Sequence, residues 1–171
     1  EGKIIMPGMI NTHHHIYSEF ARGLDFKNEK LQSFTDILKN VWWKLDKKLT
    51  LEDLRYSAYT AFIECIKNGV TTVFDHNSSP MSISGSLPTI SNVADELGIR
   101  GCYCYEVSDR DGNRVLDLAI KENIDFIKYA EKKQDDMTKG MFGMHAAFTL
   151  SDGTLNKCVK AMEGIDTGYH I

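Results

Sequence analysis

The order in which short apolar runs alternate with helical patterns constrains the fold of this chain more than any other feature. The predicted elements follow one another as 4–10 (strand), 31–49 and 51–68 (helices), 70–74 (strand), 87–97 (helix), 100–107 (strand), 113–133 (helix), 141–147 (strand), 152–162 (helix) and 167–171 (strand). Strands that alternate with helices form parallel sheets through right-handed crossovers. We therefore predict an α/β fold, which a doubly wound sheet and a (β/α)8 barrel both satisfy.

The helix predicted over 51–68 has the clearest boundary signals. Thr50 can accept hydrogen bonds from the first free backbone amides, and apolar residues then recur at helical spacing as far as Cys65. Gly69 provides a common type of helix end. No Gly-x-Gly-x-x-Gly follows the first predicted strand, which argues against a dinucleotide-binding domain.

Composition narrows the class of protein. The 171 residues have room for one domain, and 42% hydrophobic with 26% charged residues is typical of a soluble globular chain. A net charge of −4 argues against a nucleic-acid surface, and no apolar run approaches the length of about 20 residues that spans a membrane. The four cysteines form no Cys-x-x-Cys pair, so we expect a reducing, cytoplasmic setting.

Three consecutive histidines, His13, His14 and His15, follow the first predicted strand. Side chains at alternate strand positions share a side, so His13 and His15 are predicted to aim at one point, with His14 turned away. The carboxyl end of a first barrel strand is a usual place for an active site, and neutral imidazole binds zinc, iron or nickel. We predict His13 and His15 as two metal ligands, with further ligands from elsewhere. A tag remnant and an exposed histidine loop without metal are the competing interpretations.

The histidine string resembles the start of the barrel in the amidohydrolase superfamily. The segment Pro-Gly-Met-Ile-Asn-Thr-His-His-His is similar to the chlorohydrolase and cytosine-deaminase-like branch. Residues 69–76 resemble the second barrel strand of that branch. Residues 144–151 resemble its His-Ala-Pro-Tyr-Thr-x-Ser signature, with Ala147 in place of proline. Residues 74–80 and 105–110 favour the subgroup of aminohydrolases linked by name to selenium metabolism.

The resemblance implies a fold and a set of roles. It implies that residues 1–171 are the N-terminal part, about five strands, of a TIM (β/α)8 barrel, without its later strands and small flanking β-sandwich. It assigns metal binding to His13 and His15 and substrate contact to His145. Tyr169-His170-Ile171 resembles the start of a His-x-His-x-x-Glu motif. The third ligand and the proton-shuttling glutamate would then follow residue 171, so no catalytic residue is assigned within the chain.

The implied activity is metal-assisted hydrolysis. One divalent ion, first zinc and otherwise iron or nickel, lowers the pKa of its bound water toward about 7, and a carboxylate carries the proton to the leaving group. The expected enzyme is an aminohydrolase or deaminase that cleaves a non-peptide C–N bond. The expected substrate is a small nucleobase-like or amidine-containing molecule, rather than nucleic acid or a membrane.

Two other functions stay open. One is an inactive half barrel that self-associates through open strand edges, which also makes a homo-oligomer the expected state. The other is a non-enzymatic α/β binding protein with a fortuitous His-x-His. Asp75 and His76 are candidates for supporting the ligands, or else a loop-capping aspartate and an exposed histidine. Arg110 is a candidate for contacting a substrate anion, or else a solvated loop arginine.

Overall fold

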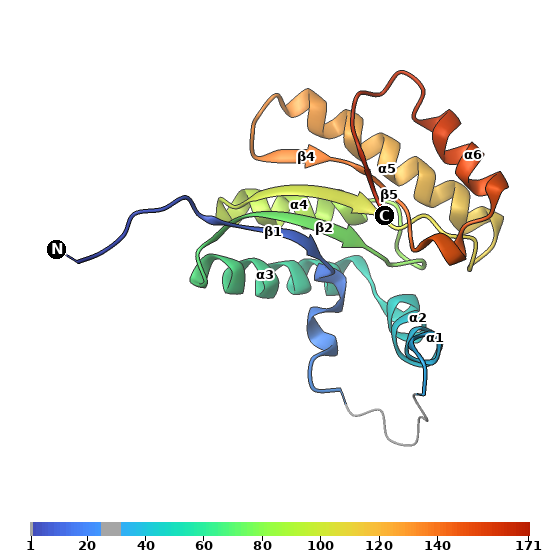
Figure 1. Cartoon of the computed structure of the whole chain (residues 1–171), viewed down its shortest axis with the longest axis horizontal. Coiled ribbons are helices and arrows are strands. Elements are labelled where there is room, and N and C mark those ends of the chain that lie inside the picture. The colour runs from blue at the N-terminus through green and yellow to red at the C-terminus, as the bar shows by residue number, and fades with distance from the viewer. Residues whose placement is uncertain (1, 25–31) are drawn as a thin grey trace.

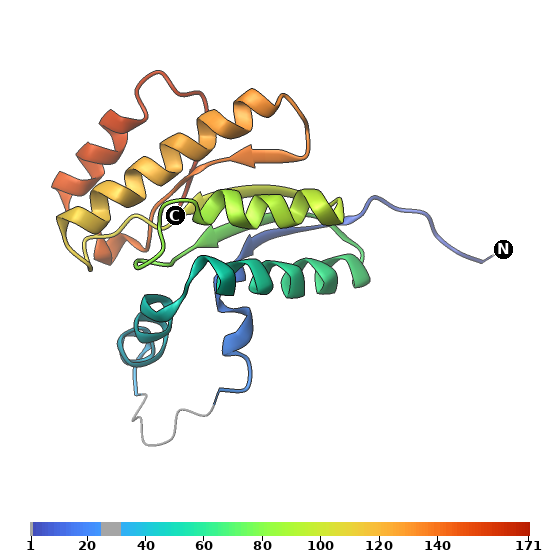
Figure 2. The same cartoon turned by 180° about the vertical axis from the view of Figure 1, so that it is seen from behind.

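All the paired strands in this computed structural model, which describes residues 2–24 and 32–171, run parallel. The main sheet has the order β1-β2-β3-β4, and β5 pairs with β6 beside it (Figures 1 and 2). The strands are β1 (Met9–His14), β2 (Val70–Asn77), β3 (Arg100–Tyr105), β4 (Thr138–Gly140), β5 (Phe142–Gly143) and β6 (Tyr169–His170). Chain neighbours are sheet neighbours throughout, whereas a doubly wound sheet reverses its strand order. The order is therefore that of a barrel wall.

The fourth strand forms as two short segments, β4 and β5, and only β5 lies within the predicted range 141–147. Val107 donates its backbone N–H to the carbonyl of Gly143 at 3.2 Å, so β5 still follows the chain beyond β3. The buried Asn123 holds both strands, because its Oδ1 accepts from the amides of Tyr105 at 2.8 Å and Gly143 at 3.2 Å. With these two segments counted as one strand, the expected run of five consecutive parallel strands is confirmed.

Four long helices connect the strands and pack beside the sheet. They are α3 (Leu51–Lys67), α4 (Ser86–Leu97), α5 (Asn113–Lys133) and α6 (Asp152–Ala161). In Figure 1, α3, α4 and α5 run along the sheet, and α3 contacts β2 while α4 and α5 contact β3. Tyr103 of β3 lies between Phe62 and Phe126, with edge-to-face ring distances of 6.4 and 5.9 Å. Each of the two buried phenylalanines stabilises the fold by roughly 1.5–3 kcal/mol.

The first strand begins later than predicted. Met9 pairs with Val70, the first residue of β2, and no strand is assigned to residues 2–8. Ile4 and Ile5 are 90% and 99% exposed, so this apolar run is not a buried strand. The prediction of a strand over 4–10 was therefore wrong in its position. A strand needs a partner, and β2 offers one only from Val70 onward.

The described parts of the segment between β1 and α3, residues 15–24 and 32–50, form a series of short helical turns beyond the carboxyl ends of β1 and β2 (Figure 1). They are 3-10 turns at Ile16–Ala21 and Asp46–Lys48, α1 (Phe34–Ile37), a π-helical turn at Leu38–Trp42 and α2 (Trp43–Leu45). One regular helix over 31–49 was expected, and this was wrong for the described part; Leu31 lies outside the described residues. No helix in the described ranges is long and apolar enough to cross a membrane.

Candidate metal centre and ligand cavity

His13 and His15 meet at the carboxyl end of β1. Their Nε2 atoms lie 3.0 Å apart, which confirms that the two side chains share one side of the strand. Two nitrogens bound to one tetrahedral zinc at about 2.0–2.1 Å would stand about 3.3 Å apart, so the pair fits a shared ion. His14 points elsewhere, with Nδ1 at 4.0 Å from Oδ1 of Asp75.

A backbone carbonyl fixes the orientation and tautomer of His15. Its Nδ1 lies 2.9 Å from the carbonyl oxygen of His76. A carbonyl only accepts, so Nδ1 carries the proton and Nε2 of the neutral ring keeps its lone pair. Burial lowers the pKa of His15, which favours that neutral form. This is the usual arrangement of a metal-binding histidine, whose other nitrogen donates to an oxygen.

His170 of β6 approaches the far side of His13. Nε2 of His170 lies 2.7 Å from Nδ1 of His13, whereas His15 faces Nε2 of that ring. The two ring nitrogens of an imidazole point in divergent directions, so His170 is placed to orient His13 rather than to share its ion. In keeping with this, the described residues contain no group of three or more His, Cys, Asp or Glu side chains arranged to hold a metal.

Asp75 and His76 are buried near the carboxyl end of β2, behind the histidine pair. Oδ1 of Asp75 accepts from the backbone N–H of Ile16 at 2.8 Å, which holds the chain just after His15. Nε2 of His76 donates to the carbonyl of Met144 at 3.1 Å. Burial raises the pKa of Asp75 to about 7 and lowers that of His76 to about 3. The interpretation of His76 as exposed is wrong, because only 3% of the residue is exposed.

A cavity of about 410 Å³ opens beside the histidine pair at the carboxyl ends of the strands. Its wall combines aromatic and titratable side chains, among them Phe34, Trp42, Trp43, Glu106, Arg110 and His145. The prediction placed a site at this end of the barrel, and the cavity lies there. An apolar cavity with a few convergent polar groups is the usual form of a small-molecule site.

His145 lines this cavity as a neutral acceptor. Oγ1 of Thr149 donates its only proton to the carbonyl of Ala146 at 2.7 Å, so it accepts from Nδ1 of His145, also at 2.7 Å. Nε2 of His145 therefore carries the lone pair. Burial lowers the pKa of His145 to about 4, which keeps the ring neutral. The position suits the expected contact with substrate.

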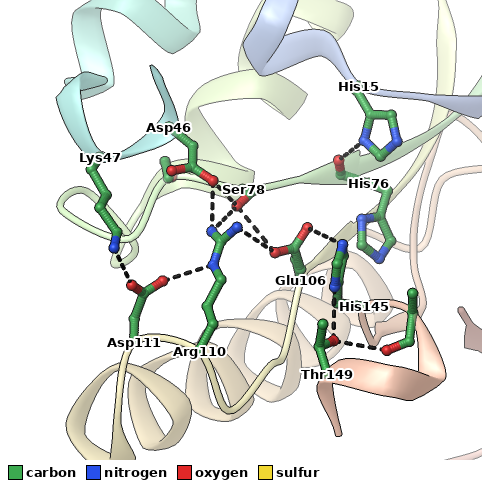
Figure 3. Close-up of polar contacts among 12 residues, drawn as sticks. His15, Asp46, Lys47, His76, Ser78, Glu106, Arg110, Asp111, His145 and Thr149 are labelled. Atoms are coloured by element: carbon green, nitrogen blue, oxygen red, sulfur yellow. Dashed lines mark hydrogen bonds and ion pairs between the residues drawn. The ribbon is translucent and has the colours of Figure 1, made fainter. Parts of the chain in front are cut away.

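Arg110 lies at the centre of a buried ion cluster that also contains Asp46, Glu106 and Asp111 (Figure 3). Its guanidinium donates to Asp46 at 2.6 Å, Ser78 at 2.9 Å and Asp111 at 2.8 Å, and lies 3.4 Å from Oε1 of Glu106. Only 9% of the side chain is exposed, so the interpretation of a solvated loop arginine is wrong. The three carboxylates offset the charge of the guanidinium, which weakens its attraction for a substrate anion.

Sequence reasoning missed Asp46 and Glu106. Asp46 lies on a surface-like Asp-Lys-Lys stretch and joins Arg110 only through the fold. For Glu106, one sequence feature could have indicated a functional role: its carboxylate stands at the end of an apolar strand.

A family model described as the amidohydrolase family matches residues 4–171 of this chain. The chain belongs to the amidohydrolase family. The predicted resemblance is thereby confirmed. The match includes the histidine run, which argues against a tag remnant and against a fortuitous His-x-His in an unrelated binding protein.

Curated relatives extend well beyond the matched region. The chain is 30% identical to a 5'-deoxyadenosine deaminase of Methanobrevibacter smithii over 171 residues, which is 100% of this chain and 37% of that protein. It is 27% identical over 151 residues to a 5-methylthioadenosine/S-adenosylhomocysteine deaminase of Thermococcus sibiricus, covering 88% of this chain and 33% of the relative. The chain thus spans about a third of the length of these relatives.

Solved structures share the fold at low sequence identity. An adenosine deaminase from Xanthomonas campestris with bound zinc matches with a TM-score of 0.78 and 17% identity, over 96% of this chain and 35% of that one. An atrazine chlorohydrolase from Arthrobacter aurescens complexed with zinc matches with a TM-score of 0.73 and 17% identity, over 96% and 40% of the two chains. The fold expected, part of a metal-dependent hydrolase barrel, is confirmed.

Proposed function

We propose that this chain contributes the first metal ligands and part of the substrate cavity of an aminohydrolase that hydrolyses a non-peptide C–N bond. The observation that carries the proposal is the 3.0 Å approach of Nε2 of His13 to Nε2 of His15, with the His15 ring held by the carbonyl of His76. Membership of the amidohydrolase family and the names of the curated deaminases support it.

His13 and His15 would hold one divalent ion through their Nε2 atoms. Zinc is the first choice, because two imidazole nitrogens suit it and the two solved relatives described above contain zinc. When bound, the ion supplies a hydroxide-like nucleophile near neutral pH. His170 orients the ring of His13, and Asp75 anchors the chain after His15.

The cavity would take a flat heteroaromatic substrate, with an adenine nucleoside as the first candidate. Trp42, Trp43 and Phe34 give the cavity an aromatic wall that excludes water and packs against a ring system. Nε2 of His145 accepts a hydrogen bond from the bound molecule. The relatives' names support the adenine class. All four cysteines are free and buried, which suits the cytoplasm we propose as its location.

Ammonia release by the full-length gene product tests this function. The protein is loaded with zinc and incubated with 5'-deoxyadenosine, 5-methylthioadenosine, guanine and a chlorotriazine. We expect ammonia from an adenine nucleoside, with a matching change in its ultraviolet spectrum. Chloride release from the triazine instead would replace the C–N assignment by a C–Cl one. A folded, zinc-loaded protein that releases neither product contradicts the proposal.

A further inference from the structure

Glu106 divides its carboxylate between the buried ion cluster and the ligand cavity. Oε1 lies 3.4 Å from both Arg110 and the hydroxyl oxygen of Ser78. Oε2 lies 3.9 Å from Nε2 of His145, and the residue lines the cavity. Figure 3 shows the carboxylate between the guanidinium and the imidazole. Oε1 therefore contacts the ion cluster, and Oε2 faces the ligand cavity.

Oε2 of Glu106 and Nε2 of His145 form a pair of acceptors. The Thr149 contact leaves Nε2 of His145 without a proton. Burial raises the pKa of Glu106 to about 7 against the opposing charge of Arg110, so above that pH its carboxylate also has no proton to give. At 3.9 Å the two atoms are too far apart for a hydrogen bond, but one donor group placed between them reaches both. An amine, an amidine or a hydroxyl group has the required protons.

The charge around Glu106 disfavours anions. The carboxylates of Asp46, Glu106 and Asp111 all pair with Arg110, and Asp111 also pairs with Lys47. Among the described residues that line the cavity, Arg110 is the only lysine or arginine, and it is engaged by all three carboxylates. A carboxylate or phosphate brought to this wall meets negative charge without a free cation to receive it.

We propose that Glu106 determines substrate specificity, by accepting, together with His145, a hydrogen bond from a neutral or cationic donor group and by rejecting anionic substituents. This rests on the proposed function. His13, His15, Glu106 and His145 line the same cavity. For a nucleoside whose reacting carbon lies at the histidine pair, we assign the 5' substituent to the wall formed by Glu106 and His145.

The competing explanation is that Glu106 serves only as a counter-ion for Arg110. Asp111 provides a matched control, because it also pairs with Arg110, through Nε at 2.8 Å, but is absent from the cavity lining. Glu106→Gln removes the charge of the cavity carboxylate. Asp111→Asn removes an equal charge from the same cluster and leaves the cavity wall intact.

The test measures equilibrium binding of two probes to the full-length protein by calorimetry: 5'-amino-5'-deoxyadenosine, a cation, and adenosine 5'-carboxylate, an anion. We expect the wild type to prefer the amine. Glu106→Gln should reduce the ratio of the two affinities by about tenfold or more, because a like charge within a few ångströms is removed, whereas Asp111→Asn should keep the wild-type ratio.

An unchanged ratio in Glu106→Gln, an equal shift in Asp111→Asn, or failure of the wild type to bind either probe overturns the inference. Turnover is measured separately on the same samples. If both probes bind with the predicted ratio but no ammonia is released from any adenine nucleoside, the proposed function fails and the role of Glu106 in binding stands.

Discussion

Hydrogen bonds to oxygen acceptors fix which nitrogen carries the proton in two histidines that face the cavity. Nδ1 of His15 donates to the carbonyl of His76, and Nδ1 of His145 donates to Thr149. Both rings therefore present Nε2 as an acceptor. Strand alternation alone predicted the shared side of His13 and His15. The tautomers were beyond sequence reasoning, because the partner of His15 lies 61 residues away in the chain.

The half-buried His145 predicts a pH dependence of stability. Its pKa is lowered to about 4 from the ordinary 6.5, so the unfolded chain takes up a proton first as the pH falls. The stabilisation is complete above 6.5 and is lost as the pH falls toward 4. His145→Asn keeps a donor for Thr149 but does not titrate. We expect it to lose less unfolding free energy than the wild type between about pH 7 and about pH 5 in urea titrations. Equal losses in both proteins contradict this.

The four long helices, α3 to α6, were predicted more accurately than the strands because their end signals are local. Thr50 accepts from the amide of Asp53, whose carboxylate accepts from Thr50 in return, and Gly69 follows α3 with φ of 76°. Strand limits depend on distant partners. β1 starts where Val70 becomes available, and the fourth strand divides at Met141, where the pairing partner changes from β3 to β6.

The cap of α3 makes a local contribution that can be measured. Thr50→Ala removes the side-chain acceptor for the amide of Asp53, so the free energy of unfolding should fall by about 1 kcal/mol. Thr60→Ala is the control, because the Thr60 hydroxyl bonds to the carbonyl of Tyr56 inside the same helix. Chemical denaturation of both variants checks this. Similar losses for the two variants would show that Thr50 has no special role at the helix start.

The sheet as a whole presents an unpaired strand edge. β1 pairs with β2 and, within the described residues, with no other strand. Met9 and Ile10 on this strand are 58% and 60% exposed. The order of the strands in the sheet could be predicted from the alternation of strand and helix patterns in the sequence, because each crossover joins neighbouring strands. The ion cluster around Arg110 could not, because the fold brings together residues as distant as Asp46 and Arg110.

This edge predicts self-association of the 171-residue chain. Exposed apolar residues on an unpaired strand favour pairing with a second copy. Ile10→Lys places a charge on the edge and should shift the chain toward monomer in sedimentation velocity. Ile66→Lys is the control, because Ile66 is also exposed, at 45%, but lies on α3. A wild-type monomer at all concentrations, or an equal effect of both variants, contradicts the prediction.

Zinc binding by histidine variants of the full-length protein tests the central claim most directly. Competition with a chromophoric chelator gives the affinity of the wild type and of His13→Ala, His15→Ala and His14→Ala. We predict one zinc per wild-type chain and a loss of about a hundredfold or more in affinity for His13→Ala and His15→Ala, because each removes a direct ligand. His14→Ala should bind zinc like the wild type, since His14 points toward Asp75. Unchanged affinity in His13→Ala or His15→Ala, or an equal loss in His14→Ala, would contradict the account.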